Sequence, residues 1–174
     1  MDNHLDMQHV LSFIPLRNHM TVAHIRSGSG RFTIPLAKAL WGGKVYAVDT
    51  REDMLEAVRQ RAKEARLGNI DALKFRGSKL PLEPNSLDGA LLVSALDGNG
   101  VAGNAGLFKA ISGTLAKNAW LAVVETYAPA KEADPSPGKQ ISKEEIVRLG
   151  TEVGLQEVLF RMLDNDHYLV VLRK

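Results

Sequence analysis

A glycine-rich turn and one acidic residue carry the clearest chemistry in the sequence. Residues 26–30 read Arg-Ser-Gly-Ser-Gly after an apolar run, and Asp49 stands about twenty residues further on, at the end of the next apolar run. Glycines let the backbone approach a ligand without a Cβ in the way, and the helix that follows presents free N–H groups. A carboxylate at the second position can accept both hydroxyls of a ribose. Gly28, Gly30 and Asp49 therefore indicate a site for an adenosine-containing cofactor.

A second glycine motif offers a rival position for a nucleotide. Residues 98–103 read Gly-Asn-Gly-Val-Ala-Gly, the spacing of dinucleotide-binding turns, and Glu125 follows at the end of the next apolar run. We expect residues 97–106 to form a loop and the next helix to begin only near Gly106, so that these glycines do not open it. A nucleotide site at this motif would also leave no role for the spacing of the first glycine turn and Asp49. A nicotinamide or flavin dinucleotide is therefore the weaker hypothesis.

The apolar pattern predicts the elements that must position these motifs. Short β-rich runs alternate with segments of helical period, which is typical of a parallel sheet with helical crossovers. The expected strands are residues 20–25, 44–48, 72–75, 88–96 and 120–124, followed by a hairpin of residues 155–162 and 167–172. The expected helices are residues 5–14 and 32–41 and the segments around Val58, Ile111 and Leu149. One domain is expected to span residues 1–174, with residues 1–19 as a short, partly helical N-terminal segment.

Short-range spacing also predicts where two helices begin and end. A hydroxyl residue followed three positions later by an acid is the spacing of a capping box, and a glycine after the last apolar position is a common stop. The expected capping pairs are Thr50 with Asp53 and Ser142 with Glu145, and the expected stops are Gly68 and Gly154.

The first turn belongs to a longer resemblance. Residues 21–33, Thr-Val-Ala-His-Ile-Arg-Ser-Gly-Ser-Gly-Arg-Phe-Thr, resemble motif I of class I S-adenosylmethionine-dependent methyltransferases. Residues 43–49, with Met54 and Leu55 after them, resemble the ribose-binding strand and helix of this family, particularly its small ubiquinone-biosynthesis-like (type 11) branch. Residues 80–88 resemble the stretch that leads into the fourth strand of the family, and residues 166–174 resemble its closing antiparallel strand.

The resemblance implies both a fold and a reaction. The implied fold is a Rossmann-like, doubly wound α/β sheet of seven strands in the order 3-2-1-4-5-7-6, with the last strand antiparallel and helices on both faces. The implied reaction is methyl transfer from S-adenosylmethionine to a small acceptor. Such enzymes work largely by holding the methyl group and the nucleophile in line, so no catalytic residue is assigned. The residues expected to contact the cofactor are Arg26, Gly28, Gly30, Asp49, Thr50, Ser78 and Ser94.

Two departures from the family pattern fall at this site. Motif I of the family runs Asp-x-Gly-x-Gly-x-Gly, whereas this chain has His24 at the acidic position and Arg26 at the first glycine. The family acid helps to hold the ammonium of the methionine moiety, and a histidine cannot supply that negative charge. Arg26 either occludes the methionine moiety or binds its carboxylate. Ser78 stands where the family has an adenine-side acid and is a weaker partner for the adenine amine.

These departures motivate a second hypothesis of a different class. The changes cluster at the cofactor turn while the core pattern stays intact. A methyltransferase fold that has lost its cofactor and serves as a binding or scaffold module would show this combination. Binding of S-adenosylmethionine, or of its demethylated product, separates the two hypotheses.

Composition narrows the remaining function classes. The 174 residues, 45% hydrophobic and 24% charged, have the profile of one soluble globular domain, and the longest apolar run, residues 90–96, is too short to cross a bilayer. No secretory signal is visible, so we expect a cytoplasmic protein. The chain has no cysteine, its histidines show no metal spacing, and its 22 basic against 20 acidic residues give no nucleic-acid signal. The expected partner is a small-molecule substrate, at an accessible site or one closed by a second subunit in a homodimer.

Overall fold

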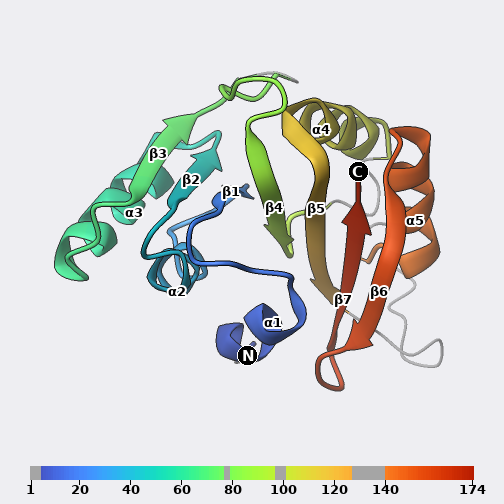
Figure 1. Cartoon of the computed structure of the whole chain (residues 1–174), viewed down its shortest axis with the longest axis horizontal. Helices are drawn as coiled ribbons and strands as arrows, with labels where there is room; N and C mark the ends of the chain where they lie inside the picture. The colour runs from blue at the N-terminus through green and yellow to red at the C-terminus, as the bar shows by residue number, and fades with distance from the viewer. Residues whose placement is uncertain (1–4, 77–78, 97–100, 127–139) are drawn as a thin grey trace.

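A seven-stranded sheet forms the centre of the protein in a computed structural model, which describes residues 5–76, 79–96, 101–126 and 140–174. The strand order is β3-β2-β1-β4-β5-β7-β6, as the resemblance implies (Figure 1). The first five strands pair in parallel, and β7 is antiparallel to both β5 and β6. The strands are β1 (Thr21–Ile25), β2 (Lys44–Asp49), β3 (Ile70–Lys74), β4 (Leu87–Val93), β5 (Leu115–Thr126), β6 (Gln156–Met162) and β7 (His167–Arg173).

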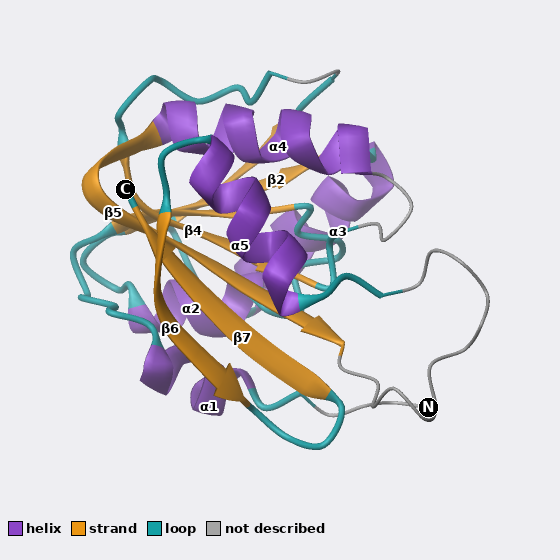
Figure 2. Cartoon of the chain, turned by 90° about the vertical axis from the view of Figure 1, so that its right-hand side faces the viewer, coloured by secondary structure: helices purple, strands orange, loops and turns teal. Residues whose placement is uncertain are grey.

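Helices cover both faces of the sheet, and each face has its own apolar core (Figure 2). Helices α4 and α5 pack on one face, with Phe108 and Ile146 fully buried between them and the sheet. Helices α1 and α2 pack on the other face through side chains such as Val10 and Leu36. The helices are α1 (Met7–Phe13), α2 (Thr33–Ala39), α3 (Glu52–Glu64), α4 (Val101–Thr114) and α5 (Lys143–Glu152). No helix in the described residues is both long and apolar enough to cross a membrane.

The direction of winding reverses between β1 and β4. From β1 the chain adds β2 and β3 on one side, and then returns to add β4 and β5 on the other side. In a doubly wound sheet, ligands bind outside the carboxyl ends of the strands at this point of reversal. The segments that follow β1, β2 and β4 therefore meet at one edge of the sheet.

The start of α3 differs from the expected capping box. The N-cap residue is Arg51, whose side chain makes no capping hydrogen bond, and Thr50 with Asp53 does not form the predicted pair. The helix thus begins one residue later than predicted, and the N–H of the N-cap residue Arg51 bonds to Oδ1 of Asp49 at 3.0 Å. The expected cap at Ser142 is confirmed, since its side chain accepts the N–H of Glu145 at the start of α5.

The end of α3 also differs from expectation. The helix ends at Glu64, four residues before Gly68. Arg66 adopts the left-handed φ of 54° and donates its N–H to Lys63, while the N–H of Leu67 bonds to the carbonyl of Ala62. This is a Schellman ending with arginine in the position that glycine usually fills. Gly154, at a φ of 84°, closes α5 as expected.

The segment before β5 is helical where a loop was expected. Helix α4 begins at Val101, so Gly103 and Gly106 lie inside it, and residues 97–100 are outside the described residues. The helical face of Leu107 and Ile111 is buried as predicted. Glycine content alone therefore misplaced this boundary, because the helix is held by the apolar face that it buries against the sheet.

The close approach of β1 and β2 constrains one glycine. A Cβ at Gly43 would lie 2.1 Å from the carbonyl oxygen of Met20, whereas a Cβ at Gly42 would approach no described atom closer than 3.6 Å. The Met20 oxygen accepts the N–H of Lys44 at 3.1 Å, so it cannot move without loosening the first hydrogen bond between the strands.

We expect Gly43→Ala to lower the free energy of unfolding by about 2 kcal/mol, because the backbone must shift to admit the methyl group. Gly42→Ala is the matched control and should change it by less than about 0.5 kcal/mol. Urea unfolding followed by circular dichroism measures both. Equal midpoints for the two variants would contradict the close approach.

Candidate functional site

The turn between β1 and α2 is built on two glycines with positive φ. Gly28 has a φ of 54° and Gly30 a φ of 83°. A Cβ at Gly30 would lie 2.9 Å from Cγ2 of Val58, so α3 packs directly beneath this part of the turn. A Cβ at Gly28 would meet nothing within 4 Å. The turn is thus packed below at Gly30 and has open space at Gly28, where a ligand can approach the backbone.

Asp49 joins this turn to the end of β2. Its Oδ2 accepts the N–H of Gly28 at 2.8 Å, and its Oδ1 accepts the N–H of Arg51 at 3.0 Å. Asp49 is buried, with 8% of its surface exposed. Each carboxylate oxygen has a second acceptor position, so Asp49 can still accept two hydroxyl groups from a ligand. The predicted pairing of the glycine turn with this acid is therefore a direct contact.

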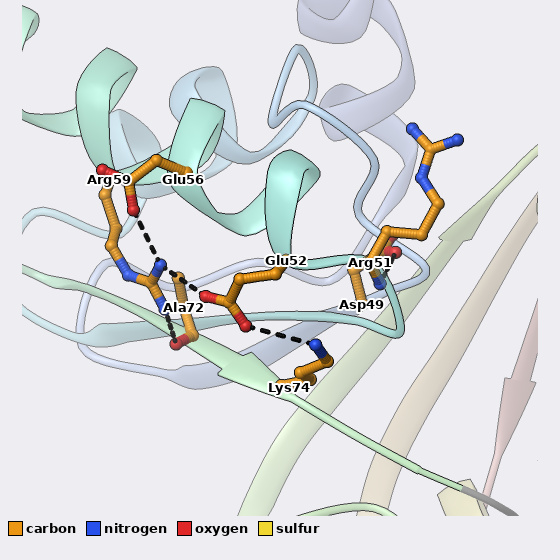
Figure 3. Close-up of polar contacts among 7 residues, drawn as sticks. All are labelled: Asp49, Arg51, Glu52, Glu56, Arg59, Ala72 and Lys74. Carbon is orange, nitrogen blue, oxygen red and sulfur yellow. Dashed lines mark hydrogen bonds and ion pairs between the residues drawn. The ribbon is translucent and has the colours of Figure 1, made fainter.

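An ion-pair cluster ties α3 to β3 next to Asp49 (Figure 3). Glu52 pairs with Arg59 at 2.9 Å, and Arg59 also reaches the carbonyl of Ala72 at 3.4 Å. The hydrogen bond from Arg59 lowers the pKa of Glu52. Exposed pairs of this kind contribute little stability, so their effect here is positional. The other members of the cluster are Glu56 and Lys74.

His24 lies inside the fold, beneath the turn. It is 1% exposed, and its Nδ1 is 2.8 Å from Oγ1 of Thr33, the first residue of α2. Burial lowers the pKa of His24 to about 4, against the opposing effect of the negative charge on Asp49. The imidazole is therefore neutral at pH 7, and it links β1 to α2.

Arg26 spans the gap between the ends of β1 and β4. Its φ is 55°, a value that suits the glycine of the family pattern, and its side chain is exposed. Its Nη1 donates a hydrogen bond to the carbonyl of Ala95. Ser94, the residue before Ala95, is also exposed, and its backbone N–H donates to Val124 of β5 at 2.8 Å. Arg26 and Ser94 are thus brought to the same part of the edge.

Glu125 is a buried acid beside this arginine, and the adenosine-site reasoning overlooked it. Its Oε1 accepts the N–H groups of Ala95 and Leu96, both at 2.9 Å. Burial raises the pKa of Glu125 to about 7, while the two N–H bonds and the charge of Arg26 oppose that shift. The signal in the sequence is an acid at the end of an apolar strand, the same feature that supports the rival dinucleotide motif.

The structure brings most of the predicted contact residues to one edge of the sheet. Thr50 is exposed directly after Asp49. Ser78 lies outside the described residues, as do Gly98 and Gly100 of the rival motif. The residues placed together at the ends of β1, β2 and β4 are Arg26, Gly28, Gly30, Asp49, Thr50 and Ser94. No group of three histidine, aspartate or glutamate side chains within the described ranges is placed to hold a metal ion.

The strand order and the turns that meet at this edge are those of a Rossmann-like domain. A family model described as "Methyltransferase domain" matches residues 22–118, more than half of the chain. The chain therefore belongs to this methyltransferase family. The resemblance to class I S-adenosylmethionine-dependent methyltransferases is confirmed, and S-adenosylmethionine is the cofactor of that class. A search of curated proteins finds no significant sequence match.

Solved structures share the fold over nearly the whole chain. A SAM-dependent methyltransferase from Aquifex aeolicus superposes with a TM-score of 0.85 at 22% identity, covering 97% of this chain and 89% of that one. A SAM-dependent methyltransferase from Methanosarcina mazei gives 0.74 at 16% identity, with 91% and 94% covered. Geranyl diphosphate C-methyltransferase from Streptomyces coelicolor gives 0.80 at 11% identity, with 96% and 78% covered.

The two buried titrating groups of the site should give opposite pH dependences. Between pH 4 and 6.5 the unfolded chain binds a proton at His24 that the folded protein does not, so stability falls as the pH falls through this range. Between pH 4.5 and 7 the folded protein keeps a proton on Glu125 that the unfolded chain loses, so stability falls as the pH rises. The two effects largely cancel where the ranges overlap.

As the pH rises from 4.5 to 7, we expect the His24→Asn variant to become less stable, because only the effect of Glu125 remains. As the pH rises from 4.5 to 6.5, we expect the Glu125→Gln variant to become more stable, because only the effect of His24 remains. Each change is at most about 3 kcal/mol. Urea unfolding at half-unit pH steps measures the slopes. The quantity compared is the slope of the unfolding free energy against pH, so a loss of stability that is equal at every pH does not affect the result. Two variants with the same slope would contradict the assignment.

Proposed function

We propose that this protein transfers the methyl group of S-adenosylmethionine to a small-molecule acceptor. The observation that carries the proposal is the 2.8 Å hydrogen bond from the N–H of Gly28 to Asp49, which joins the glycine turn to an acid able to accept ribose hydroxyls at the point where the sheet winding reverses. Membership of the methyltransferase family supports it. So does the similar fold of a geranyl diphosphate C-methyltransferase, whose structure contains geranyl diphosphate and S-adenosylhomocysteine.

In this proposal, the residues of this edge contact different parts of the cofactor. Gly28 and Gly30 lie under it, and Asp49 accepts the ribose hydroxyls, which leaves Thr50 beside the adenine. Ser78 borders the adenine in the same proposal. The sulfonium of the cofactor supplies an activated methyl group, and the chain contributes position: it fixes the ribose end at β2 and directs the other end toward Ser94 at β4.

Arg26 takes the carboxylate of the methionine moiety in this proposal. Its guanidinium already stands at the end of β4, beside Ser94, where the methionine end falls. Arginine binds carboxylates through paired, charge-assisted hydrogen bonds. The acid missing at His24 has a counterpart in Glu125, which keeps a carboxyl group next to Arg26.

One observation favours the alternative, a scaffold that has lost the cofactor. The guanidinium of Arg26 already bonds to the carbonyl of Ala95, and a side chain held in that place occupies room that the methionine moiety needs. The two proposals differ in a single equilibrium, the binding of S-adenosylhomocysteine.

Titration calorimetry with S-adenosylhomocysteine tests the proposed function. We expect binding to the wild type, and a loss of about tenfold or more in Asp49→Asn, because a charged acceptor of the ribose hydroxyls becomes neutral. Asp53→Asn is the control, since it removes an equal charge from the exposed first turn of α3. The absence of binding to folded wild-type protein would overturn the proposal in favour of the scaffold.

Arg26→Ala tests the carboxylate contact. We expect the affinity for S-adenosylhomocysteine to fall by about tenfold or more, the effect of a lost charge-assisted bond. The affinity for 5′-methylthioadenosine, which lacks the amino-acid end, should stay the same. Arg31→Ala removes the same charge from the same turn and serves as the control. Tighter binding of S-adenosylhomocysteine to Arg26→Ala would show that the guanidinium occludes the site.

Two wider expectations belong to the same proposal. The first is a cytoplasmic location, and the second is a site that is either accessible to solvent or closed by a second subunit. Sedimentation of the protein with and without S-adenosylhomocysteine distinguishes a monomer from a homodimer.

A further inference from the structure

A pocket of about 550 Å³ lies beside the carboxyl end of β5, and none of the predicted cofactor contacts lines it. Its walls come from the end of β5, the start of α5 and the hairpin of β6 and β7. The volume lies within the range of small-molecule sites. The lining residues used below are Thr126, Ile141, Lys143, Phe160 and Tyr168.

Two aromatic rings form an apolar wall of this pocket. Phe160 of β6 and Tyr168 of β7 lie with their ring centroids 6.1 Å apart, tilted by 45°. The Tyr168 ring is buried and fixed, because its hydroxyl donates to the carbonyl of Ile141. Phe160 is 37% exposed and is a large apolar surface that the fold leaves open. Rings held at fixed angles favour a flat aromatic partner over a flexible chain.

The polar rim of the pocket carries both signs of charge. Lys143 lies 4.9 Å from the centroid of the Phe160 ring and pairs with Glu157 at 2.8 Å. Glu144, next to it, also lines the pocket. A cation already paired and an acid beside it give no net attraction for a charged ligand, so the pocket suits a neutral one.

The pocket lies on the side to which the cofactor site points. Strands β1, β4 and β5 are parallel neighbours, so Thr126 is at the same edge as Arg26, two strand spacings (about 10 Å) across the sheet and two residues further along β5. Between them lies Glu125, which bonds to Ala95 and pairs across the strands with Tyr168. A ligand that runs from Asp49 toward β4 therefore ends next to this pocket.

We propose that this pocket binds the methyl acceptor, and that the acceptor is a neutral, planar aromatic molecule with a hydroxyl or amino nucleophile. The inference rests on the proposed function. The lone pair of the acceptor oxygen or nitrogen forms the bond to the methyl carbon, and the electron pair of the broken methyl–sulfur bond stays on sulfur, which gives S-adenosylhomocysteine. The proton of the acceptor passes to water.

The test uses 2-naphthol, a planar aromatic alcohol, and its saturated analogue decahydro-2-naphthol, which has the same carbon skeleton without flat rings. Both are titrated into the full chain, with and without S-adenosylhomocysteine. We expect saturable binding of 2-naphthol, at least about tenfold tighter than that of the saturated analogue. Phe160→Ala should weaken 2-naphthol by about tenfold, the scale of a lost aromatic contact with its buried area.

Val158→Ala is the control for Phe160→Ala. Val158 is on the same strand and 50% exposed, but it does not line the pocket, so its loss should leave 2-naphthol binding unchanged. The affinity for S-adenosylhomocysteine should be the same in all three proteins, which shows that the cofactor site remains intact.

Three outcomes would overturn the inference while the proposed function stands. In each of them S-adenosylhomocysteine binds normally. In the first, 2-naphthol shows no saturable binding, and in the second it binds no more tightly than its saturated analogue. In the third, 2-naphthol binds Phe160→Ala as tightly as it binds the wild type. A wild type that binds 2-naphthol through Phe160 but does not bind S-adenosylhomocysteine would instead overturn the proposed function, and the acceptor role with it.

Discussion

The site depends on the two hydrogen bonds that the carboxylate of Asp49 accepts from backbone N–H groups. One fixes Gly28 in the turn after β1, and the other fixes Arg51 at the start of α3. A single buried acid thus holds the ends of two strands and the beginning of a helix in one arrangement. Because its oxygens keep free acceptor positions, the same group that builds the edge can also bind a ligand. Structure and recognition are not separable at this residue.

Charge is distributed along this edge in a way that departs from the family pattern. A neutral, buried His24 replaces an acid, and Arg26 adds a cation where the family has a glycine. The buried acid beside Arg26 is Glu125, which comes from β5 and not from β1. The end of the edge near β4 therefore carries an opposed pair, a guanidinium and a carboxyl group joined through the backbone of Ala95. In the proposed function, this pair faces the amino-acid end of the cofactor.

Spacing along the chain predicted the features that depend on local backbone geometry. The separation of Gly28 from Asp49 indicated the site, and the resemblance supplied the strand order. The predictions for α3 failed because nearby residues filled the expected positions. The N-cap is Arg51 and not Thr50, and Arg66 ends the helix through backbone hydrogen bonds that need no glycine. Glu125 was missed as a site residue because its partners are thirty and twenty-nine residues away in sequence, so no short motif records them.

The pocket beside β5 and the ribose edge come from different parts of the chain. The family match ends at residue 118, whereas the described residues that line the pocket, from Thr126 to Tyr168, all come later in the chain. The two parts touch through β4 and β5, whose register is set by buried backbone pairing and not by side chains at the pocket. Exposed side chains of the pocket, such as Phe160, can therefore be replaced without touching the hydrogen bonds that Asp49 accepts from Gly28 and Arg51. In the proposed function, the choice of acceptor is thus adjustable independently of the cofactor contact.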